Sequence, residues 1–523
     1  MTLALISEGA TSITAFLLVV VASFFLCLVA GAADDTVAGF LMANRSLGSV
    51  RNGLAMCGDF VSVTTLLIPV ATIVLAGHDG MLFTASSIVA VLVLLLIAEP
   101  LRNLGAFTLG GILATRAPGS RAHTAGTVIT LLVCVPLIVV QLKVAGDATA
   151  YLLGLETPGA SQVCIALIGL LIVSFAAFGG MHGTSVIETA KVLLAFGTFA
   201  TAAAFVLKRF DWDLAKLFDA SAHGSGNGKH YFEPGQLYGH TLAGSAERLS
   251  VCLTLALGSA VIPPLFMRIS ASRTGRTARR SARNAVLAFA AFSLALTILG
   301  LGAAALAGPA IAARGERGYA ALFLLSDAIA DHRGGIFLTL FACAIFVTAL
   351  GAVSGLTLST AAALSRDLPT RRADKTSEEA QVRTTRWWLG AVGIVSVTLA
   401  VILNDWNILF FASYAAALAA STILPTLLYT LFWKSFTRRG LLATLYGGAA
   451  CCLLLQALSL SVSGRPTALF PQHDFHWIPL ENVALITIPL GFLIGWLTSR
   501  LDRLPPIDIT PTRQRIFSSD TAA

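Results

Sequence analysis

The sequence predicts an all-α polytopic membrane protein with about thirteen transmembrane helices. Of its 523 residues, 56% are hydrophobic and only 12% are charged, whereas a soluble domain carries about 25% charged residues. Apolar runs of about 18 residues or more recur from one end of the chain to the other, and a run of that length can cross a bilayer as a helix. The composition therefore excludes a soluble globular protein.

The predicted transmembrane segments follow these apolar runs in chain order. They lie at residues 10–32, 52–76, 81–101, 123–153, 161–179, 185–207, 247–270, 284–308, 335–364, 385–404, 407–433, 439–461 and 480–500. The first run has no basic stretch before it, which favours a membrane helix over a cleaved signal peptide.

Short clusters of Arg and Lys follow the first, third, seventh, ninth, eleventh and last segments, which are all odd-numbered. Because cytoplasmic loops are enriched in basic residues, we expect a multi-pass plasma (inner) membrane protein with its N-terminus outside and its C-terminus in the cytoplasm. These clusters account for the net charge of +8 without a nucleic-acid partner. The polar stretches 208–246, 309–334 and 462–478 are then external, and residues 505–523 are expected to form a disordered cytoplasmic tail.

The second segment carries the strongest functional signal. The sequence from Asn52 to Gly80 reads NGLAMCGDFVSVTTLLIPVATIVLAGHDG, and it places Asp59 within an apolar run. A carboxylate at membrane depth costs about 2.5–3.5 kcal/mol on insertion scales, and it persists where it faces a cavity, an ion or a partner. Gly58 and Pro69 favour an interrupted helix, which exposes carbonyls that can ligate cations. We therefore predict an ion-coupled transporter site in this segment; the alternative is a kinked structural helix whose Asp59 is satisfied by a neighbour.

Polar residues recur inside three further segments. In the fourth, VVQLKVAGDAT contains Gln141, Lys143 and Asp147. Lys143 and Asp147 are four positions apart and share a helix face, so Lys143 either pairs with Asp147 or offers positive charge to an anionic substrate.

The sixth segment contains Glu188 and Lys191 near its expected cytoplasmic start, where Lys191 could snorkel to the interface. The ninth carries a cluster of hydroxyl side chains that includes Thr348 and Ser354. Such hydroxyls either bond back to their own helix or ligate a cation.

The order of the segments suggests an inverted repeat. Segments 2–6 and 7–11 are two sets of five, and because five is odd the second set enters the membrane from the opposite side. Each set opens on a helix with Gly and Pro interruptions; in the second set this is SVCLTLALGSAVIPPLFMR, with Gly258 and Pro263-Pro264. Paired interrupted helices at matching places indicate a binding site near the middle of the membrane.

Enzyme chemistry finds little support in the sequence. The chain contains no HExxH, GxSxG, Walker or Rossmann motif, and its eight cysteines show no CxxC spacing. We therefore expect a secondary transporter without a cofactor, driven by an ion gradient rather than directly by ATP. A passive channel and a transporter-derived sensor are the rival classes, and the tail after Arg500 is far too short for a signalling domain.

Several strings in the chain resemble one known family. NGLAMCGDFVSVTTLL, AGHDGMLF, IAEPLRNLGAFTLGGILATR, ALGSAVIPPLFMR and AVSGLTLSTAAALSRDL are similar to the sodium:solute symporter family, and AEPLRNLG at Ala98–Gly105 is typical of its acetate/monocarboxylate permease branch. The resemblance covers roughly residues 37–460. It implies a leucine-transporter-type fold of five plus five inverted-repeat helices, and import of acetate, propionate or pyruvate with a cation, usually Na⁺, by alternating access.

The resemblance also implies a division of the chain. Residues 1–36 would form an N-terminal extra transmembrane helix and the start of a cytoplasmic loop, and residues 37–460 the symporter core. Within the core, repeat one would lie at about 52–207 and repeat two at about 247–461. Residues 461–504 would hold a C-terminal extra transmembrane helix.

Site residues follow from the same resemblance. Asp59 stands where several family members keep an aspartate important for Na⁺, and the carbonyls around Cys57 and Phe60 match those that ligate the ion. Glu188 matches an acidic residue near the ion exit path, and Lys191 matches a lysine of the acetate-type branch. Independently of the resemblance, we expect the substrate between the two interrupted helices, near Ser62, Gln141, Lys143 and Gly258; Lys143 stands where the branch carries an apolar residue.

The ninth segment departs from the family pattern. The two adjacent hydroxyl residues that complete the sodium site fall on Gly351 and Ala352, Thr348 falls on a carbonyl-donating position, and Ser354 lies one turn away. Because Na⁺ needs about five or six oxygen ligands, in the manner of hard cations, the coupling ion is left open between Na⁺ and H⁺. A carboxylate could carry the proton, or a lysine ammonium could mimic the cation. A sodium-independent carrier of another small organic solute is the alternative function.

Overall fold

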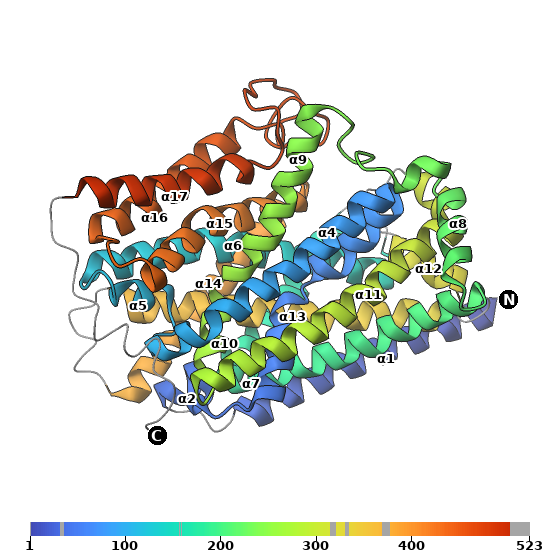
Figure 1. Cartoon of the computed structure of the whole chain (residues 1–523). Coiled ribbons are helices and arrows are strands. Elements are labelled where there is room, and N and C mark those ends of the chain that lie inside the picture. Colours follow the sequence, from blue (N-terminus) through green and yellow to red (C-terminus); the bar gives the residue numbers. More distant parts are fainter. Residues whose placement is uncertain are drawn as a thin grey trace.

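The computed structural model describes residues 2–31, 36–155, 157, 159–313, 321–329, 334–368 and 377–502. In this part of the chain all regular elements are helices, with three isolated β-bridges besides. The long helices run side by side in one bundle (Figure 1). Ten of them are long and apolar enough to cross a membrane, and α1 contributes a shorter apolar stretch, Ile13–Leu26. The predicted all-α polytopic class is confirmed; the predicted tail at 505–523 lies outside the described residues.

The helices follow one another along the chain with short connections. They are α1 (Thr2–Gly31), α2 (Val37–Met42), η1 (Ala43–Arg45), α3 (Ser49–Phe60), α4 (Val63–Leu104), α5 (Leu109–Ala114), α6 (Ser120–Leu152), α7 (Ala160–Arg209), α8 (Leu214–Gly224), η2 (Gly228–Phe232), α9 (Leu242–Leu253), η3 (Thr254–Gly258), η4 (Ser259–Val261), α10 (Pro263–Ser270), α11 (Gly275–Ala313), α12 (Ala321–Ile329), α13 (Gly334–Asp367), α14 (Glu378–Ile402), α15 (Ile408–Phe432), α16 (Arg438–Ala457) and α17 (Ala484–Leu501).

Two of these helices each extend across two predicted segments. α4 has 42 residues and α7 has 50, whereas about 20 residues of helix suffice to cross the hydrocarbon core of a bilayer. Each is bent within its length, α4 at Ala76 (φ −152°, ψ 58°) and α7 at Gly180 (φ 50°, ψ −161°). Glycine adopts the positive φ at position 180 without a steric penalty. The predicted segments therefore follow one another in α4 and α7 without a loop.

Both predicted helix interruptions are present. α3 ends at Phe60, Val61 and Ser62 are extended, and α4 then begins with the Ser62 hydroxyl accepting a hydrogen bond from the Thr65 N–H. The second interrupted helix runs through α9, a π-helical turn (η3) and a short 3₁₀ turn (η4) to a break at Ile262 (φ −65°, ψ 139°). α10 restarts at Pro263, where a proline suits the first helical position because no N–H is needed there.

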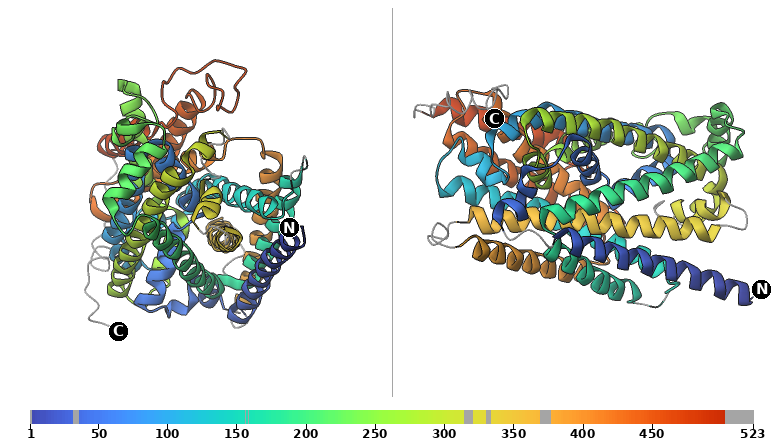
Figure 2. Two further views of the ribbon diagram at one scale, coloured as in Figure 1. Left: turned by 90° about the vertical axis from the view of Figure 1, so that its right-hand side faces the viewer. Right: turned by 90° about the horizontal axis from the view of Figure 1, so that it is seen from below.

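α13 lies in the middle of the bundle. In an apolar 18-residue stretch of α13, 83% of the residues are buried, and the helix packs against α6, α7 and α14. The view along the bundle in Figure 2 shows the other long helices around it. α13 also contacts α3 and α10, so it lies beside both interrupted helices.

The structure corrects three predictions about loops. The stretch 208–246 is not simply a polar loop, because it contains α8 and η2, and the buried Tyr231 hydroxyl donates to the Ile73 carbonyl. The stretch 309–334 contains α12. Arg268, one of the basic residues expected on the cytoplasmic side after the seventh segment, is instead buried inside α10, because that helix continues to Ser270.

The start of α1 and the end of α17 lie at opposite ends of the bundle (Figure 1). An odd number of crossings, as predicted, places the two termini on opposite sides of a membrane. α8 and α12 lie at the same end as the start of α1, whereas α2, α5 and α10 lie toward the other end. Which end is cytoplasmic stays a prediction from the basic residues.

Candidate functional site

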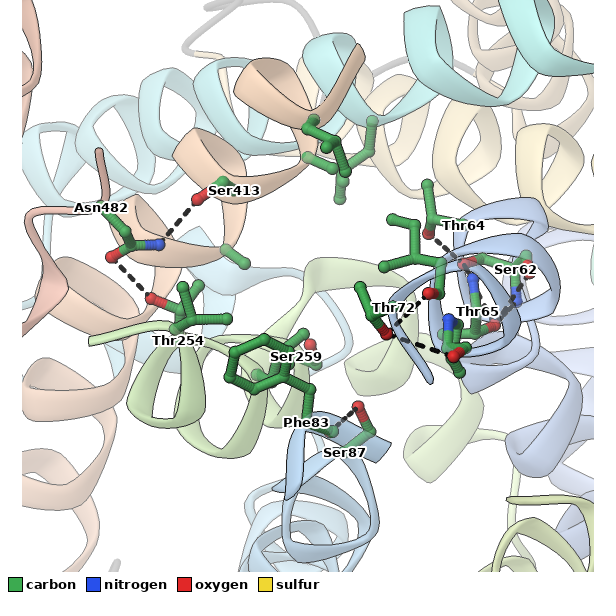
Figure 3. A pocket seen from close by; sticks show the side chains of 18 of the residues that line it. Ser62, Thr64, Thr65, Thr72, Phe83, Ser87, Thr254, Ser259, Ser413 and Asn482 are labelled. Atoms are coloured by element: carbon green, nitrogen blue, oxygen red, sulfur yellow. Dashed lines mark hydrogen bonds between the residues drawn. The ribbon is translucent and has the colours of Figure 1, made fainter. Parts of the chain in front are cut away.

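A cavity of about 510 Å³ lies between the break before α4 and the helices α9 and α15. Figure 3 shows Ser62, Thr64, Thr65 and Thr72 on one side of it and Thr254, Ser413 and Asn482 on the other. Its aromatic lining residues are Phe60, Phe83, Tyr238, Phe289 and Phe410. Polar side chains set among apolar and aromatic ones in a concave wall are typical of a small-molecule site.

The amino end of α4 forms one wall of this cavity. Ser62 caps the helix, and its hydroxyl lies 2.7 Å from the Thr64 hydroxyl. The Val63 N–H donates to Oε1 of Gln141 over 2.9 Å. Gln141 is only 2% exposed, yet it lines the cavity, and no described residue accepts a hydrogen bond from its amide nitrogen. A helix N-terminus with free donors nearby favours an anionic group.

Asp59 is bonded to an arginine at the end of the second interrupted helix. Arg268 donates from Nε to Oδ2 of Asp59 over 3.0 Å and from Nη2 to Oδ1 over 3.3 Å, and its Nη1 donates to the Ser185 hydroxyl over 2.6 Å. The two charged side chains are 2–3% exposed. This bidentate geometry is the strong form of an arginine–carboxylate contact. Arg268 is thus the neighbour that the alternative interpretation of Asp59 required, and its place in an apolar run after Pro263 was the signal for it.

A second buried ion pair lies beside the first. Nζ of Lys191 is 2.5 Å from Oε2 of Glu188, and both side chains are 0% exposed. A β-carbon on Gly58 of α3 would collide with the Glu188 carboxylate, and one on Gly351 of α13 would lie 2.7 Å from Oε1 of Glu188. The pair therefore fills the space between α3 and α13. Its burial contradicts the alternative that Lys191 snorkels to the membrane surface.

The predicted cation ligands lie around these pairs. The Cys57 carbonyl accepts from the Val61 N–H over 2.9 Å, and the Phe60 carbonyl accepts from the Thr65 hydroxyl over 2.9 Å. The hydroxyls of Thr348 and Ser354 are buried, with no hydrogen-bond partner among the described residues. Ala352 lines the main cavity. Their role as ligands stays a prediction.

Two predicted substrate residues do not line the main cavity. Lys143 lines a neighbouring cavity of about 420 Å³ together with Asp147 and Asp405. It donates to the backbone carbonyls of Asn404 and, over 3.2 Å, Trp406. Gly258 packs closely against the backbone of α15, where a β-carbon would collide with the Ala416 carbonyl. Of the four predicted substrate residues, Ser62 and Gln141 therefore line the main cavity, whereas Lys143 and Gly258 do not.

The bundle is closed beyond the ion pairs, toward the end that holds α2 and α10. Nδ2 of Asn52 donates to the Arg268 carbonyl over 3.0 Å and to the Ser272 hydroxyl over 2.8 Å. Nε of Arg102 donates to the Ser272 carbonyl over 2.6 Å, and Leu47 pairs with Ser272 in a β-bridge. The two buried ion pairs thus lie between the cavity on one side and these hydrogen bonds on the other.

The comparison with protein families decides the class. The sodium:solute symporter family matches residues 40–448, which is most of the chain. The chain belongs to this family. It is therefore a secondary transporter, and the predicted cation-coupled symport and integral membrane location hold for it at the level of the family.

Curated relatives extend the match to nearly the whole symporter. A monocarboxylic acid transporter of Corynebacterium glutamicum is 33% identical over 511 residues, covering 94% of this chain and 92% of the relative. The uncharacterized symporter YwcA of Bacillus subtilis is 33% identical over 504 residues, covering 95% and 96%. The predicted resemblance is confirmed.

Solved structures confirm the fold of the symporter. The substrate-bound, outward-open state of a Na⁺-coupled sialic acid symporter aligns over 94% of this chain and 98% of its own, with a TM-score of 0.74 and 14% identity. MhsT in complex with L-phenylalanine aligns over 86% and 98%, with a TM-score of 0.53 and 15% identity. These transporters share the predicted leucine-transporter-type fold.

Proposed function

We propose that this symporter imports a small monocarboxylate of the acetate, propionate and pyruvate class by alternating access. The observation that carries the proposal is the pairing of Gln141 with the amino end of α4 at the wall of the cavity. The similarity to a monocarboxylic acid transporter of C. glutamicum supports the same substrate class.

The carboxylate of such a substrate would lie against the first turn of α4. The N-terminus of a helix carries roughly half a positive charge, and the Gln141 amide together with the Ser62 and Thr64 hydroxyls supplies donors beside it. Phe83 and Phe289 line the same cavity and offer apolar surface to a short carbon tail. A neutral donor set of this kind holds an anion without a buried lysine or arginine that would retain it too tightly.

The Asp59–Arg268 pair makes this arrangement electrostatically possible. Asp59 lines the cavity, and its negative charge alone would repel a carboxylate. The two hydrogen bonds from Arg268 compensate that charge. An uncompensated charge at this depth would dominate the site, because electrostatic interactions are strong where water is excluded.

Uptake into proteoliposomes tests the proposal. Labelled acetate, propionate and pyruvate are offered separately under an imposed Na⁺ gradient and under an imposed pH gradient. Accumulation of any one of them above its equilibrium level under either gradient supports a monocarboxylate symporter. Equilibration without accumulation would indicate a facilitator, and no uptake of any of the three would contradict the substrate class.

The orientation remains part of the proposal. The distribution of basic residues favours a cytoplasmic location for the end of the bundle with α2 and α10, so the closed end would be the cytoplasmic one and the cavity would open outward. Protease or impermeant-label access to the loops on each side of right-side-out vesicles tests this assignment.

A further inference from the structure

We propose that the ammonium group of Lys191 takes the place of the cation between α3 and α13, so that this symporter does not hold Na⁺ there. The consequence for transport, that uptake of the monocarboxylate needs no Na⁺, rests on the proposed function. The binding claim stands independently, because it concerns the ion pair alone.

The residues around this position do not fit Na⁺. A sodium ion wants about five or six oxygen ligands, but Gly351 and Ala352 carry no side-chain oxygen at the two positions where the family keeps hydroxyls. Of the backbone oxygens predicted to bind it, that of Cys57 already accepts the Val61 N–H. Asp59 is directed to Arg268 by two hydrogen bonds.

The space itself is filled by the chain's own ion pair. Gly58 and Gly351 face each other across the Glu188 carboxylate, and their missing side chains are what make room for it. Nζ of Lys191 lies 2.5 Å from Oε2 of Glu188, one helical turn away along α7. A sodium ion would compete for this carboxylate with an ammonium that is covalently tethered beside it and loses little entropy on binding.

The charge balance argues the same way. Two carboxylates and two cationic groups meet at this junction, since the charges that act on Glu188 are those of Lys191, Asp59 and Arg268. All four side chains are 3% exposed or less. Adding Na⁺ would leave one positive charge without compensation in a medium where an unpaired buried charge is very costly.

Removing the ammonium should recreate a sodium site. Without it, Glu188 keeps a bare carboxylate, and α13 places the Thr348 hydroxyl, which has no hydrogen-bond partner among the described residues, one turn before Gly351. Carboxylate and hydroxyl oxygens are suitable ligands for a hard cation. The residues between α3 and α13 would thus form a cation site that the Lys191 ammonium group occupies.

Thermal unfolding of the purified protein in detergent provides the test, with NaCl compared against choline chloride at equal ionic strength. The wild type is expected to show no Na⁺-specific change in melting temperature. Lys191→Ala is expected to melt lower than the wild type in choline and to gain several degrees with Na⁺, because a ligand that binds only the folded state stabilises it. The double variant Lys191→Ala/Glu188→Gln should lose this gain.

Lys216→Ala provides the matched control, because it removes a lysine of α8 from its exposed ion pair with Asp211. It should melt identically in both salts. A Na⁺-dependent rise in the melting temperature of the wild type would overturn the proposal. A Lys191→Ala variant that folds but whose melting temperature does not change with Na⁺ would also overturn it. If Lys191→Ala does not fold, the Na⁺ titration of the wild type decides alone.

Transport gives the second readout. In proteoliposomes with an imposed pH gradient, wild-type accumulation of the monocarboxylate should be equal within about twofold in Na⁺ and in choline. A tenfold or larger requirement for Na⁺ would overturn the proposal. Absence of uptake under every condition would count against the proposed function, while the thermal measurements would still decide whether Lys191 replaces the ion.

Discussion

Arg268 of α10 and Asp59 of α3 form a bidentate ion pair that joins the two interrupted helices of the symporter, with N–O distances of 3.0 and 3.3 Å. The two residues are 209 positions apart in the chain, and each lies within one turn or two of a helix break. A third bond, from Arg268 to the Ser185 hydroxyl, ties the pair to α7. Movements of either interrupted helix must therefore carry this pair along or break it.

Asp59→Ala is expected to abolish coupled uptake while leaving the protein in the membrane. Loss of one partner of a buried ion pair costs about 3–5 kcal/mol, because the other charge remains buried and unpaired. The double variant Asp59→Ala/Arg268→Ala should regain part of the lost stability without regaining uptake. Melting temperature and uptake at equal expression measure both effects. Wild-type uptake by Asp59→Ala vesicles would contradict the role of the pair.

Gly351→Ala is expected to lower both stability and uptake, because the new methyl group would lie 2.7 Å from Oε1 of Glu188. Overpacking of this kind costs about 1–3 kcal/mol. Gly197→Ala in α7 is the control, since a β-carbon there meets nothing within 4 Å, and removing a helical glycine stabilises by about 0.5–1 kcal/mol. The melting temperature is expected to fall in Gly351→Ala and to rise in Gly197→Ala. Equal shifts in the two variants would mean that Gly351 has no special packing role.

The fold could be predicted from the sequence because its signals are local. Apolar length marks each membrane crossing, and glycine or proline marks each break, as at Gly58 and Pro263. Even the inverted order of the two halves follows from counting segments. What the apolar pattern did not show was that α4 and α7 continue through their bends, because a single residue such as Gly180 redirects the chain without a polar loop.

The site was harder to predict because its contacts are not local. The partner of Asp59 lies in the other half of the chain, and a basic residue near the end of an apolar run resembles a loop residue. Glu188 and Lys191 were expected near a helix start, and they lie about two to three turns after the bend at Gly180; their burial was not expected. Their i, i+3 spacing was visible in the sequence, but the space between α3 and α13 that they occupy was not.

Gln141→Ala is expected to weaken the apparent affinity for the monocarboxylate more than it lowers the maximal rate. A hydrogen bond to a charged group contributes about 1.5–3 kcal/mol, which corresponds to roughly a 10- to 100-fold higher KM. Gln162→Ala, at the far end of α7 and outside the cavity lining, serves as the control. The KM is measured by initial rates of uptake. An unchanged KM in Gln141→Ala would show that the Gln141 amide does not bind the substrate carboxylate.

Arg102→Ala is expected to open the sealed end of the bundle and expose Cys57. Arg102 bonds the Ser272 and Arg273 carbonyls over 2.6 and 2.8 Å, and these hold the loop after α10 against α4. Cys57 is 0% exposed and lies on α3 between this seal and the ion pairs. Opening should therefore raise its alkylation by N-ethylmaleimide at least several-fold in a variant that keeps Cys57 as its single cysteine. Arg279→Ala breaks only a largely exposed contact with Glu99 and should leave the labelling rate unchanged; similar rates in both variants would show that Arg102 does not hold the closed state.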